Sequence, residues 1–378
     1  MRGLILAATF AGIGMVLGGV GTRAQEVPKM RVSGPFSHQN LSVYFVHGAD
    51  AAGPVPLTLA EAMALGKAKL HETGNVNNLS IENTGPDEVF IQAGDIVKGG
   101  QQDRVLAVSM VLKPQSGKID IASFCVEQGR WAKRGAEDVK QFASSQESLP
   151  SKAAKLAMAS AVSPSSPVAD SGVRMQSAGL GARIIDRQVA GQRSADVSQM
   201  AQGRNETSTR QKMMWDEVAK TQEKLARNLG ASVAAPASAS SLQLSLENKK
   251  VQETRAAYVA ALAGKATDKD IVGYVIAING KIVSGDAYAS NGLFKKMWGK
   301  QMTAAATEAA SELSATPVAT QPGIADVDAF LAKASVAPMK DVRKSAAVMQ
   351  GVAETDALVY VEARRADGGW INRSYIAK

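Results

Sequence analysis

Short runs in which apolar and polar residues alternate dominate the first part of this chain. They cover residues 41–46, 79–83, 88–92, 104–112 and 118–126. Strict alternation is typical of β-strands with one buried face. Turn residues separate the runs, with Thr84–Asp87 between the second and the third and Pro114–Gly117 between the last two. The pattern predicts a sheet built from consecutive antiparallel hairpins.

Two further hairpins are predicted in the second half of the chain. Asn279-Gly280 separates the apolar runs 271–278 and 281–286. Asn-Gly is the strongest short hairpin signal, because both residues accept positive φ. Near the C-terminus, the runs 357–364 and 370–376 flank an Asp-Gly-Gly turn. We expect both pairs of runs to form antiparallel strands.

Helical spacing of apolar residues alternates with these strand segments. A short helix is predicted over residues 58–66, where Thr58 and Glu61 have the spacing of a capping box. The other predicted helices cover residues 210–229, 251–262, 291–301 and 326–333. Helices and hairpins together predict an α+β fold with a mostly antiparallel sheet and packed helices.

Three segments rich in Ser, Ala and Pro interrupt the pattern, near residues 141–191, 231–241 and 314–323. Such composition favours irregular or mobile chain, and an interdomain linker is the alternative for the first segment. A chain of 378 residues is long enough for one large domain or two smaller ones. We interpret residues 25–378 as one large α+β domain with these mobile segments as insertions.

Residues 1–24 have the features of a signal peptide. Arg2 gives a positive start, Leu4–Val20 is uncharged and apolar or small, and Thr22 and Ala24 provide the small residues that signal peptidase requires. We expect cleavage near Ala24, a periplasmic or secreted location, and no stable transmembrane span in the mature protein. An uncleaved membrane anchor is the alternative, although the apolar run is at the short edge of the spanning range.

Composition and charge narrow the classes of function. The formal net charge is +8 and the isoelectric point about 9.4. Lys and Arg are scattered without a dense basic block, and nucleic-acid binding is therefore not expected. An anionic small molecule or an envelope component is a candidate partner. The glycine motifs of nucleotide-binding loops are absent, and no cofactor is predicted.

Cysteine and histidine restrict the possible chemistry further. The single cysteine, Cys125, permits no intramolecular disulfide. The three histidines, His38, His47 and His71, lack the spacing of metal ligands, so no metal site is predicted, and a Ser-His-Asp triad would have to recruit one of them. Cys125 lies in an apolar run and is interpreted as a buried thiol, because reactive thiols need an exposed, electropositive setting.

Candidate chemistry is concentrated in two stretches, Gly94–Arg104 and Cys125–Trp131, each beside a strand-like run. Glycine pairs leave amides open to a ligand, arginine suits carboxylate or phosphate, a carboxylate can orient a hydroxyl group, and tryptophan can stack on a sugar or base. The candidate ligand-binding residues are Gly99, Gly100, Gln101, Arg104, Glu127, Arg130 and Trp131. No catalytic residue is assigned.

A structural interpretation of the same residues is also open. Gly99-Gly100 could be only a bulge or turn, while Glu127 could pair with Arg104, tying two strands together, or with Arg130. Spacing alone favours this interpretation, because polar turn clusters are common. If Glu127 instead serves a ligand, nearby arginines lower its pKa and an orienting role is expected rather than proton transfer.

The order of these motifs resembles a bacterial domain family associated with ADP-ribosylglycohydrolases and rhodanese-phosphatase proteins. The resemblance rests on Gly94–Arg104 and Cys125–Trp131. It is also carried by Pro56-Leu57-Thr58-Leu59, Glu61-Ala62 and Asn83, and more loosely by Trp215, Gly273, Asn279-Gly280, Phe294 and Arg373-Ser374-Tyr375. It extends over most of the mature chain, which implies one domain. The resemblance also implies a role in the metabolism of NAD or ADP-ribose derivatives.

Two functions from different classes follow. The first is an exported, non-catalytic binding or interaction protein of the cell envelope, in which the central cluster is structural. The alternative is binding or processing of an ADP-ribose- or sugar-phosphate-like ligand at Gly99, Arg104, Glu127 and Arg130. The sequence therefore does not decide whether the protein is an enzyme.

Overall fold

The computed structural model describes residues 30–135, 137–160, 187–314, 320–345 and 348–378. The predicted signal segment lies outside these residues, so cleavage and export stay predictions. Among the described residues, no helix combines the length and the apolar character that a membrane span requires.

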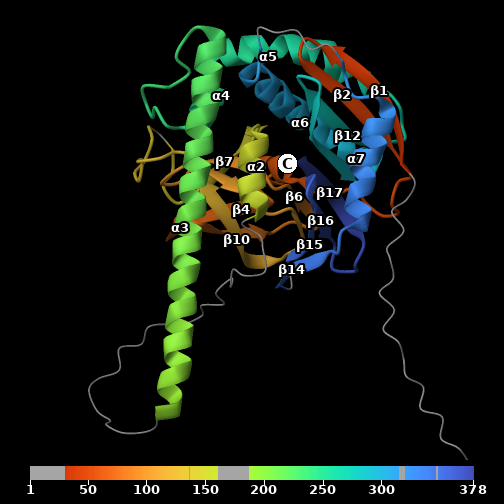
Figure 1. Ribbon diagram of the computed structural model, residues 1–378. Helices are drawn as coiled ribbons and strands as arrows, with labels where there is room; N and C mark the ends of the chain where they lie inside the picture. The colour runs from red at the N-terminus through yellow and green to blue at the C-terminus, as the bar shows by residue number, and fades with distance from the viewer. Residues whose placement is uncertain (1–29, 136, 161–186, 315–319, 346–347) are drawn as a thin grey trace, which may run out of the picture.

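An eight-stranded antiparallel sheet, hereafter the large sheet, organises the molecule, with the strand order β1-β2-β12-β13-β17-β16-β15-β14 (Figure 1). Its strands are β1 (Arg31–His38), β2 (Leu41–His47), β12 (Ile271–Ile278), β13 (Lys281–Tyr288), β14 (Lys340–Ser345), β15 (Val348–Glu354), β16 (Leu358–Arg364) and β17 (Trp370–Ala377). Both hairpins predicted for the second half are confirmed. Asn279 and Gly280 turn between β12 and β13 with φ of 51° and 73°, and β16 pairs with β17.

Two smaller sheets contain the candidate site. A six-stranded sheet has the order β11-β7-β8-β10-β5-β4, and a three-stranded sheet the order β3-β6-β9. Their strands are β3 (Leu57–Thr58), β4 (Ala68–Asn75), β5 (Asn78–Asn83), β6 (Val89–Ile91), β7 (Asp95–Gly99), β8 (Arg104–Leu106), β9 (Met110–Leu112), β10 (Gly117–Cys125) and β11 (Phe142–Ser148). All strand pairs are antiparallel except β3 and β6, which confirms the predicted α+β class with mostly antiparallel pairing.

One expected pairing and one expected strand were wrong. The runs 79–83 and 88–92 do not form a hairpin, because β5 pairs with β4 and β10 while β6 pairs with β3 and β9. Asn83 explains the separation: its side chain donates to the carbonyls of Asp87 and Lys113, which closes the intervening loop on itself. The predicted strand 104–112 is divided between β8 and β9, which belong to different sheets.

The segment 141–191 also departs from expectation in its described part. Residues 142–148 form β11, which pairs with β7, and residues 152–160 form the helix α2 (Lys152–Ser160). Pairing with a distant strand overrides the local composition here. Residues 161–186 lie outside the described part. Residues 231–241 contain turns and no named helix or strand.

Helices cover the large sheet on both faces. The described helices besides α2 are α1 (Leu59–Ala64), α3 (Arg187–Leu229), α4 (Leu242–Leu246), α5 (Lys249–Leu262, followed by a 3-10 turn at Ala263–Lys265), α6 (Asn291–Ser311) and α7 (Ile324–Val336), of which α5, α6 and α7 pack on the large sheet. Val43 and Ile276 pack against α5 and α6, whereas Tyr44 and Val275, on the opposite face, pack against α7. Because successive side chains of a strand point to opposite faces of the sheet, the core consists of two layers, one on each face. The long helix α3 runs along one side and extends past the other elements (Figure 1).

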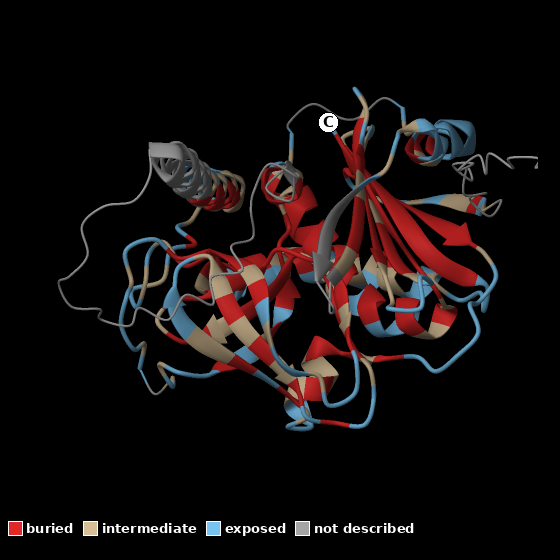
Figure 2. Ribbon diagram, turned by 90° about the horizontal axis from the view of Figure 1, so that it is seen from below, coloured by how far each residue is buried: buried red, intermediate tan, exposed pale blue. Residues whose placement is uncertain are grey.

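The small sheets and the large sheet share one core. Phe90 of β6 contacts Tyr288 of β13 in an edge-to-face arrangement, with ring centres 6.3 Å apart, and it belongs to the same buried cluster as Phe294 of α6. Buried residues run continuously along β2 and β12 of the large sheet, whereas β4 and β10 of the six-stranded sheet also carry exposed residues (Figure 2). The predicted capping box of α1 is also present, with the Glu61 amide donating to Thr58 Oγ1 and the Thr58 amide to Glu61 Oε2.

Candidate functional site

Gly99 and Gly100 form a tight turn at the end of β7. Both have positive φ, 115° and 56°, a conformation that glycine adopts without strain. A Cβ on Gly100 would lie 2.3 Å from the Phe142 ring. The Gly99 amide donates to Asp103 Oδ1 at 3.1 Å, and the Gly100 amide donates to the Gln141 carbonyl at 3.0 Å. Both amides are therefore satisfied within the protein.

A buried ionic network lies beside this turn. Arg134 donates to both oxygens of Asp103, at 2.7 and 3.0 Å, in the bidentate geometry of strong arginine–carboxylate pairs. Glu127 Oε2 lies 2.7 Å from Arg130 Nη2, and Glu127 Oε1 lies 3.4 Å from Arg134 Nη1. The side chains of Asp103 and Glu127 have 0% exposure. Each buried carboxylate thus has the charged partners that burial requires.

Neighbouring elements complete the hydrogen bonding of the two carboxylates. Ser241, the N-cap of α4, donates to Asp103 Oδ2 at 3.1 Å. The Asp103 amide donates to Glu127 Oε2 at 3.2 Å, and Gln102 Nε2 donates to the Glu127 carbonyl at 2.9 Å. These bonds join β8, the chain after β10 and α4 into one rigid unit.

Arg104 lies on β8 beside this network and is fully buried. Its Nη2 is 3.5 Å from Glu72 Oε2 on β4, and its Nη1 donates to Gln102 Oε1 at 3.2 Å. Its guanidinium carbon is 5.6 Å from the centre of the Trp131 ring, within range of a cation–π contact. Arg104 Nε has no hydrogen-bond partner. Trp131, in contrast, is 47% exposed.

The electrostatics of the network keep Glu127 charged. Burial alone would raise the pKa of Glu127, but hydrogen bonds and the charge of Arg130 hold it below its ordinary value. Burial raises the pKa of Asp103, which its bonds to Arg134 only partly oppose. Those bonds in turn raise the pKa of Arg134 despite its own burial. Glu127 is thus suited to holding a cation and not to accepting a proton near neutral pH.

Cys125 has the properties of an inert thiol. It is fully buried on β10, and burial raises its pKa to about 12. Gln211 of α3 binds both of its backbone groups, accepting from the Cys125 amide and donating to its carbonyl, each at 2.9 Å. The α3 side chain therefore replaces a neighbouring strand at this point of the sheet.

The structure brings the seven predicted residues into one region. The Gln101 amide approaches Glu72 Oε2 at 3.4 Å, the same carboxylate that faces Arg104, and Arg130 approaches the Gly100 carbonyl at 3.5 Å. The ion pair considered between Arg104 and Glu127 does not form. Arg104 pairs with Glu72 instead, because its guanidinium is directed from β8 towards β4. Glu127 pairs with Arg130.

Sequence reasoning missed several members of this cluster. Asp103 lies inside the first predicted stretch, and Arg134 lies just beyond the second. Their charges could have identified both residues. Glu72 and Ser241 had no local signal, because strand pairing and the position of α4 bring them to the site from distant parts of the chain.

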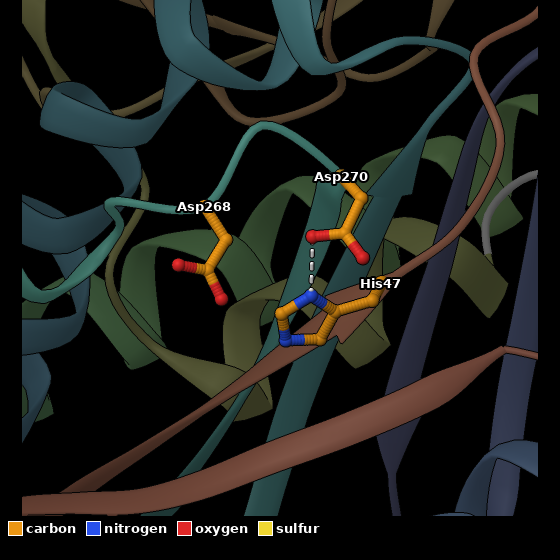
Figure 3. Close-up of side chains that lie close together, drawn as sticks. All are labelled: His47, Asp268 and Asp270. Atoms are coloured by element: carbon orange, nitrogen blue, oxygen red, sulfur yellow. Dashed lines mark hydrogen bonds and ion pairs between the residues drawn. The ribbon is translucent and has the colours of Figure 1, made fainter.

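A second polar group lies where β1, β2 and the start of β12 meet (Figure 3). His47 Nδ1 is 2.8 Å from Asp270 Oδ1, and His47 Nε2 is 2.8 Å from Ser33 Oγ. His47 is buried whereas Asp270 is half exposed. Arg31 Nη2 lies 2.9 Å from His47 Nδ1 and 3.1 Å from Asp270 Oδ2. Hydrogen bonds and the His47 charge lower the pKa of Asp270.

Within the described residues, His47, Asp268 and Asp270 form a group whose ligand atoms are close enough to hold a metal ion. The Arg31 guanidinium, however, already contacts two of those atoms. A second cation there would meet that positive charge. The order Ser33, His47, Asp270 also has the connectivity of a hydrolytic triad, but Arg31 competes for the histidine nitrogen that a triad reserves for its carboxylate. We assign the group a structural role in joining the three strands.

The chain matches the family model of the ARG and Rhodanese-Phosphatase-superfamily-associated Protein domain (ARPP-1) over residues 29–376. The match covers nearly the whole chain, including all three sheets. The chain belongs to this family. The resemblance drawn from the two central motifs is therefore confirmed. Neither a curated protein nor a solved structure matches the chain.

In this ARPP-1 domain the carboxylates of the central cluster outnumber its guanidinium groups. Three guanidiniums face four carboxylates, Arg104, Arg130 and Arg134 against Glu72, Asp103, Glu127 and Glu137. The cluster therefore has no excess positive charge to attract an anion. One exposed aromatic residue, Trp131, lies at its edge.

Proposed function

We propose that this protein is an exported, non-catalytic binding or interaction protein of the cell envelope. The observation that carries the proposal is the internal pairing of Asp103 and Glu127 with Arg130 and Arg134. Catalytic groups need a free proton acceptor or nucleophile, and here the carboxylates are engaged with arginines while the Cys125 thiol is buried. The signal-like segment at residues 1–24 supports export.

Substitutions in the network test its structural role. Arg134→Ala leaves the Asp103 carboxylate buried without its main partner, and we expect it to lower the free energy of unfolding by about 3–5 kcal/mol. Trp131→Ala at the exposed edge is the matched control and should have a much smaller effect. Urea unfolding of both variants measures this. Wild-type stability of Arg134→Ala would contradict a structural role for the network.

Export has its own test. Expression of the full chain in a Gram-negative host, followed by fractionation and intact-mass measurement, should give a periplasmic protein that starts at Gln25. Replacing the apolar residues Leu4 and Leu6 by Gln should retain the full-length chain in the cytoplasm. A full-length wild-type chain in the cytoplasm would contradict the localisation and leave only the binding function.

A second candidate function is binding of an ADP-ribose- or sugar-phosphate-like ligand at the Gly99, Arg104, Glu127 and Arg130 cluster. One observation favours it: Trp131 is 47% exposed and lies over the Arg104 guanidinium, whose Nε has no hydrogen-bond partner. An exposed indole on a rigid base is a suitable stacking surface for a base or sugar.

Thermal-shift and calorimetric titration with ADP-ribose and ribose 5-phosphate distinguish the two candidates. Ligand binding that Trp131→Ala abolishes, and that Met213→Ala leaves intact, would establish the second function. Met213 is the matched control because it is another exposed large apolar residue. No saturable binding by the wild-type protein would leave the structural interpretation of the cluster in place.

A further inference from the structure

A cavity with a mixed apolar and polar lining lies where the large sheet meets the two smaller sheets, away from the arginine–carboxylate cluster. Its volume is about 40 Å³, several times the roughly 10–15 Å³ that a single buried water needs. Ser284 and Asp286 of β13 and Ser374 of β17 form its floor, and Lys155 and Met158 of α2 lie on another side. The cavity can hold a molecule larger than one water.

Asp286 is the central polar group of this cavity. It is buried, and its two oxygens accept hydrogen bonds from Ser374 Oγ at 2.5 Å and from the Tyr274 hydroxyl at 2.6 Å. Each carboxylate oxygen has capacity for one further donor. Two fixed hydroxyl groups thus orient a carboxylate that can still accept hydrogen bonds from a ligand.

Lys155 supplies the opposite charge without closing onto Asp286. Burial raises the pKa of Asp286, and the nearby Lys155 ammonium partly opposes this. Yet the Lys155 ammonium forms no hydrogen bond or ion pair with any described residue, although Lys155 lines the cavity and is only partly exposed. The Asp286 carboxylate and the Lys155 ammonium both line the cavity without contacting each other. A ligand between them can therefore donate to the carboxylate and accept from the ammonium.

Two glutamines add unpaired polar atoms at the wall. Gln301 Nε2 and Gln350 Oε1 are buried without a hydrogen-bond partner, and both residues line the cavity. Tyr274 lies 3.2 Å from Gln301 Oε1, so one end of the Gln301 amide is engaged whichever way it is turned, and the other end is not. Unpaired buried polar atoms are costly, and such atoms at a cavity wall indicate a ligand.

We propose that this cavity binds a small uncharged molecule rich in hydroxyl groups, of the size of glycerol or a pentose. The opposite charges of Asp286 and Lys155 cancel, which favours a neutral ligand. Hydroxyl groups both donate and accept, and they match walls that present acceptors at Asp286 and Gln350, a donor at Lys155 and the free end of the Gln301 amide. This site adds to the proposed envelope function and uses none of the residues of the arginine–carboxylate cluster.

Isothermal titration calorimetry of the mature protein with D-ribose and with glycerol tests the assignment. We expect saturable binding of at least one of them, weakened about tenfold or more by Gln301→Met, which keeps the side-chain length and removes the amide. Gln243→Met is the matched control, because Gln243 is another buried glutamine with an unpaired Oε1 but lies on α4 outside the cavity. Its affinity should equal that of the wild type.

Lysine acetylation gives an independent readout of the location. The bound sugar should slow acetylation of Lys155 and leave Lys249, which is highly exposed on α5, unaffected. Asp286→Asn provides a second variant of the same wall should Gln301→Met fold poorly. In the absence of sugar, removal of the unpaired amide by Gln301→Met should raise the melting temperature.

Three results would overturn the proposal. The first is that neither D-ribose nor glycerol binds the wild-type protein at tens of millimolar. The second is unchanged affinity in both Gln301→Met and Asp286→Asn. The third is saturable binding of glycine in place of the sugars, which would show a zwitterion site. Trp131→Ala should leave D-ribose binding intact, so failure here is separable from failure of the cluster assignment.

Discussion

Glu147 and Arg255 form a bidentate ion pair, with the Arg255 guanidinium donating to the two Glu147 oxygens at 2.6 and 2.8 Å. Both residues are buried, and 108 residues separate them in the sequence. Glu147 lies at the end of β11 and Arg255 in the middle of α5. The pair therefore fixes the six-stranded sheet to a helix that covers the large sheet.

Removal of one partner of this pair should be strongly destabilising. Glu147→Ala leaves the Arg255 charge buried, and we expect the free energy of unfolding in urea to fall by about 3–5 kcal/mol. The matched control is Lys249→Ala, which removes an exposed ion pair with Glu253 on the same helix and should change stability little. Equal effects of the two substitutions would contradict the role assigned to Glu147.

Gly100→Ala should destabilise the turn for two separate reasons. The positive φ of 56° disfavours alanine by about 1–2 kcal/mol, and the new methyl group would press on the Phe142 ring. Gly129→Ala isolates the first cost, because Gly129 also has positive φ but no atom within 4 Å of a Cβ. Chemical denaturation should show the larger loss for Gly100→Ala, with partial recovery in the double variant Gly100→Ala/Phe142→Leu. A loss no greater than that of Gly129→Ala would rule out the packing contribution.

Cys125 should be unreactive in the native protein. Burial raises its pKa to about 12, so almost no thiolate exists at pH 8 and the sulfur is also shielded from reagent. A thiol assay with a chromogenic disulfide at pH 8 should give no reaction over the time in which the urea-unfolded protein reacts fully. Rapid native labelling at one equivalent would show that the thiol is accessible.

Glu308 should make stability depend on pH near neutrality. Its carboxyl lies in the core and accepts a hydrogen bond from the Lys152 amide at 2.6 Å. Burial raises its pKa from 4.5 to about 7, against the opposing charge of Lys155. The unfolded chain therefore releases this proton at lower pH than the folded protein does. The contribution is fully present below pH 4.5 and is lost as the pH rises to 7, by roughly 3 kcal/mol at most.

Glu308→Gln isolates this contribution. The difference in unfolding free energy between the variant and the wild type should move in favour of the variant between pH 4.5 and pH 7.5, measured in urea at fixed ionic strength. Comparison with the variant is needed because carboxyls with lowered pKa, such as Glu127, give the opposite pH dependence. A difference that is constant across this range would contradict the raised pKa of Glu308.

Much of the fold could be predicted from local patterns, and the errors have a common cause. The β12–β13 hairpin and the capping box of α1 depend on neighbouring residues, and both were predicted correctly. The pairing of β6 with β3 and β9 depends on segments up to several tens of residues away, and alternation alone cannot specify a partner. The strand β11 was missed because its Ser-rich sequence is stabilised by pairing with β7.

The candidate site shows the same division. The residues Gly99, Arg104, Glu127 and Arg130 were identified because glycines and charges cluster within short stretches of sequence. Their pairing was not predictable, since Glu72 reaches Arg104 only through the β4–β5–β10–β8 order of the sheet. The Asp286 cavity had no sequence signal at all, because its polar residues are separate serines, glutamines and charges on many different elements.

The sequence by itself determined many of the strands and helices, the positions of several tight turns, and the family to which the chain belongs, because these properties reside in residue order over short distances. Only the tertiary structure decided which strands pair, which charged side chains form ion pairs, and where polar side chains line a cavity. Those outcomes depend on contacts between residues far apart in the chain, whose free energy is gained only when the whole core is assembled.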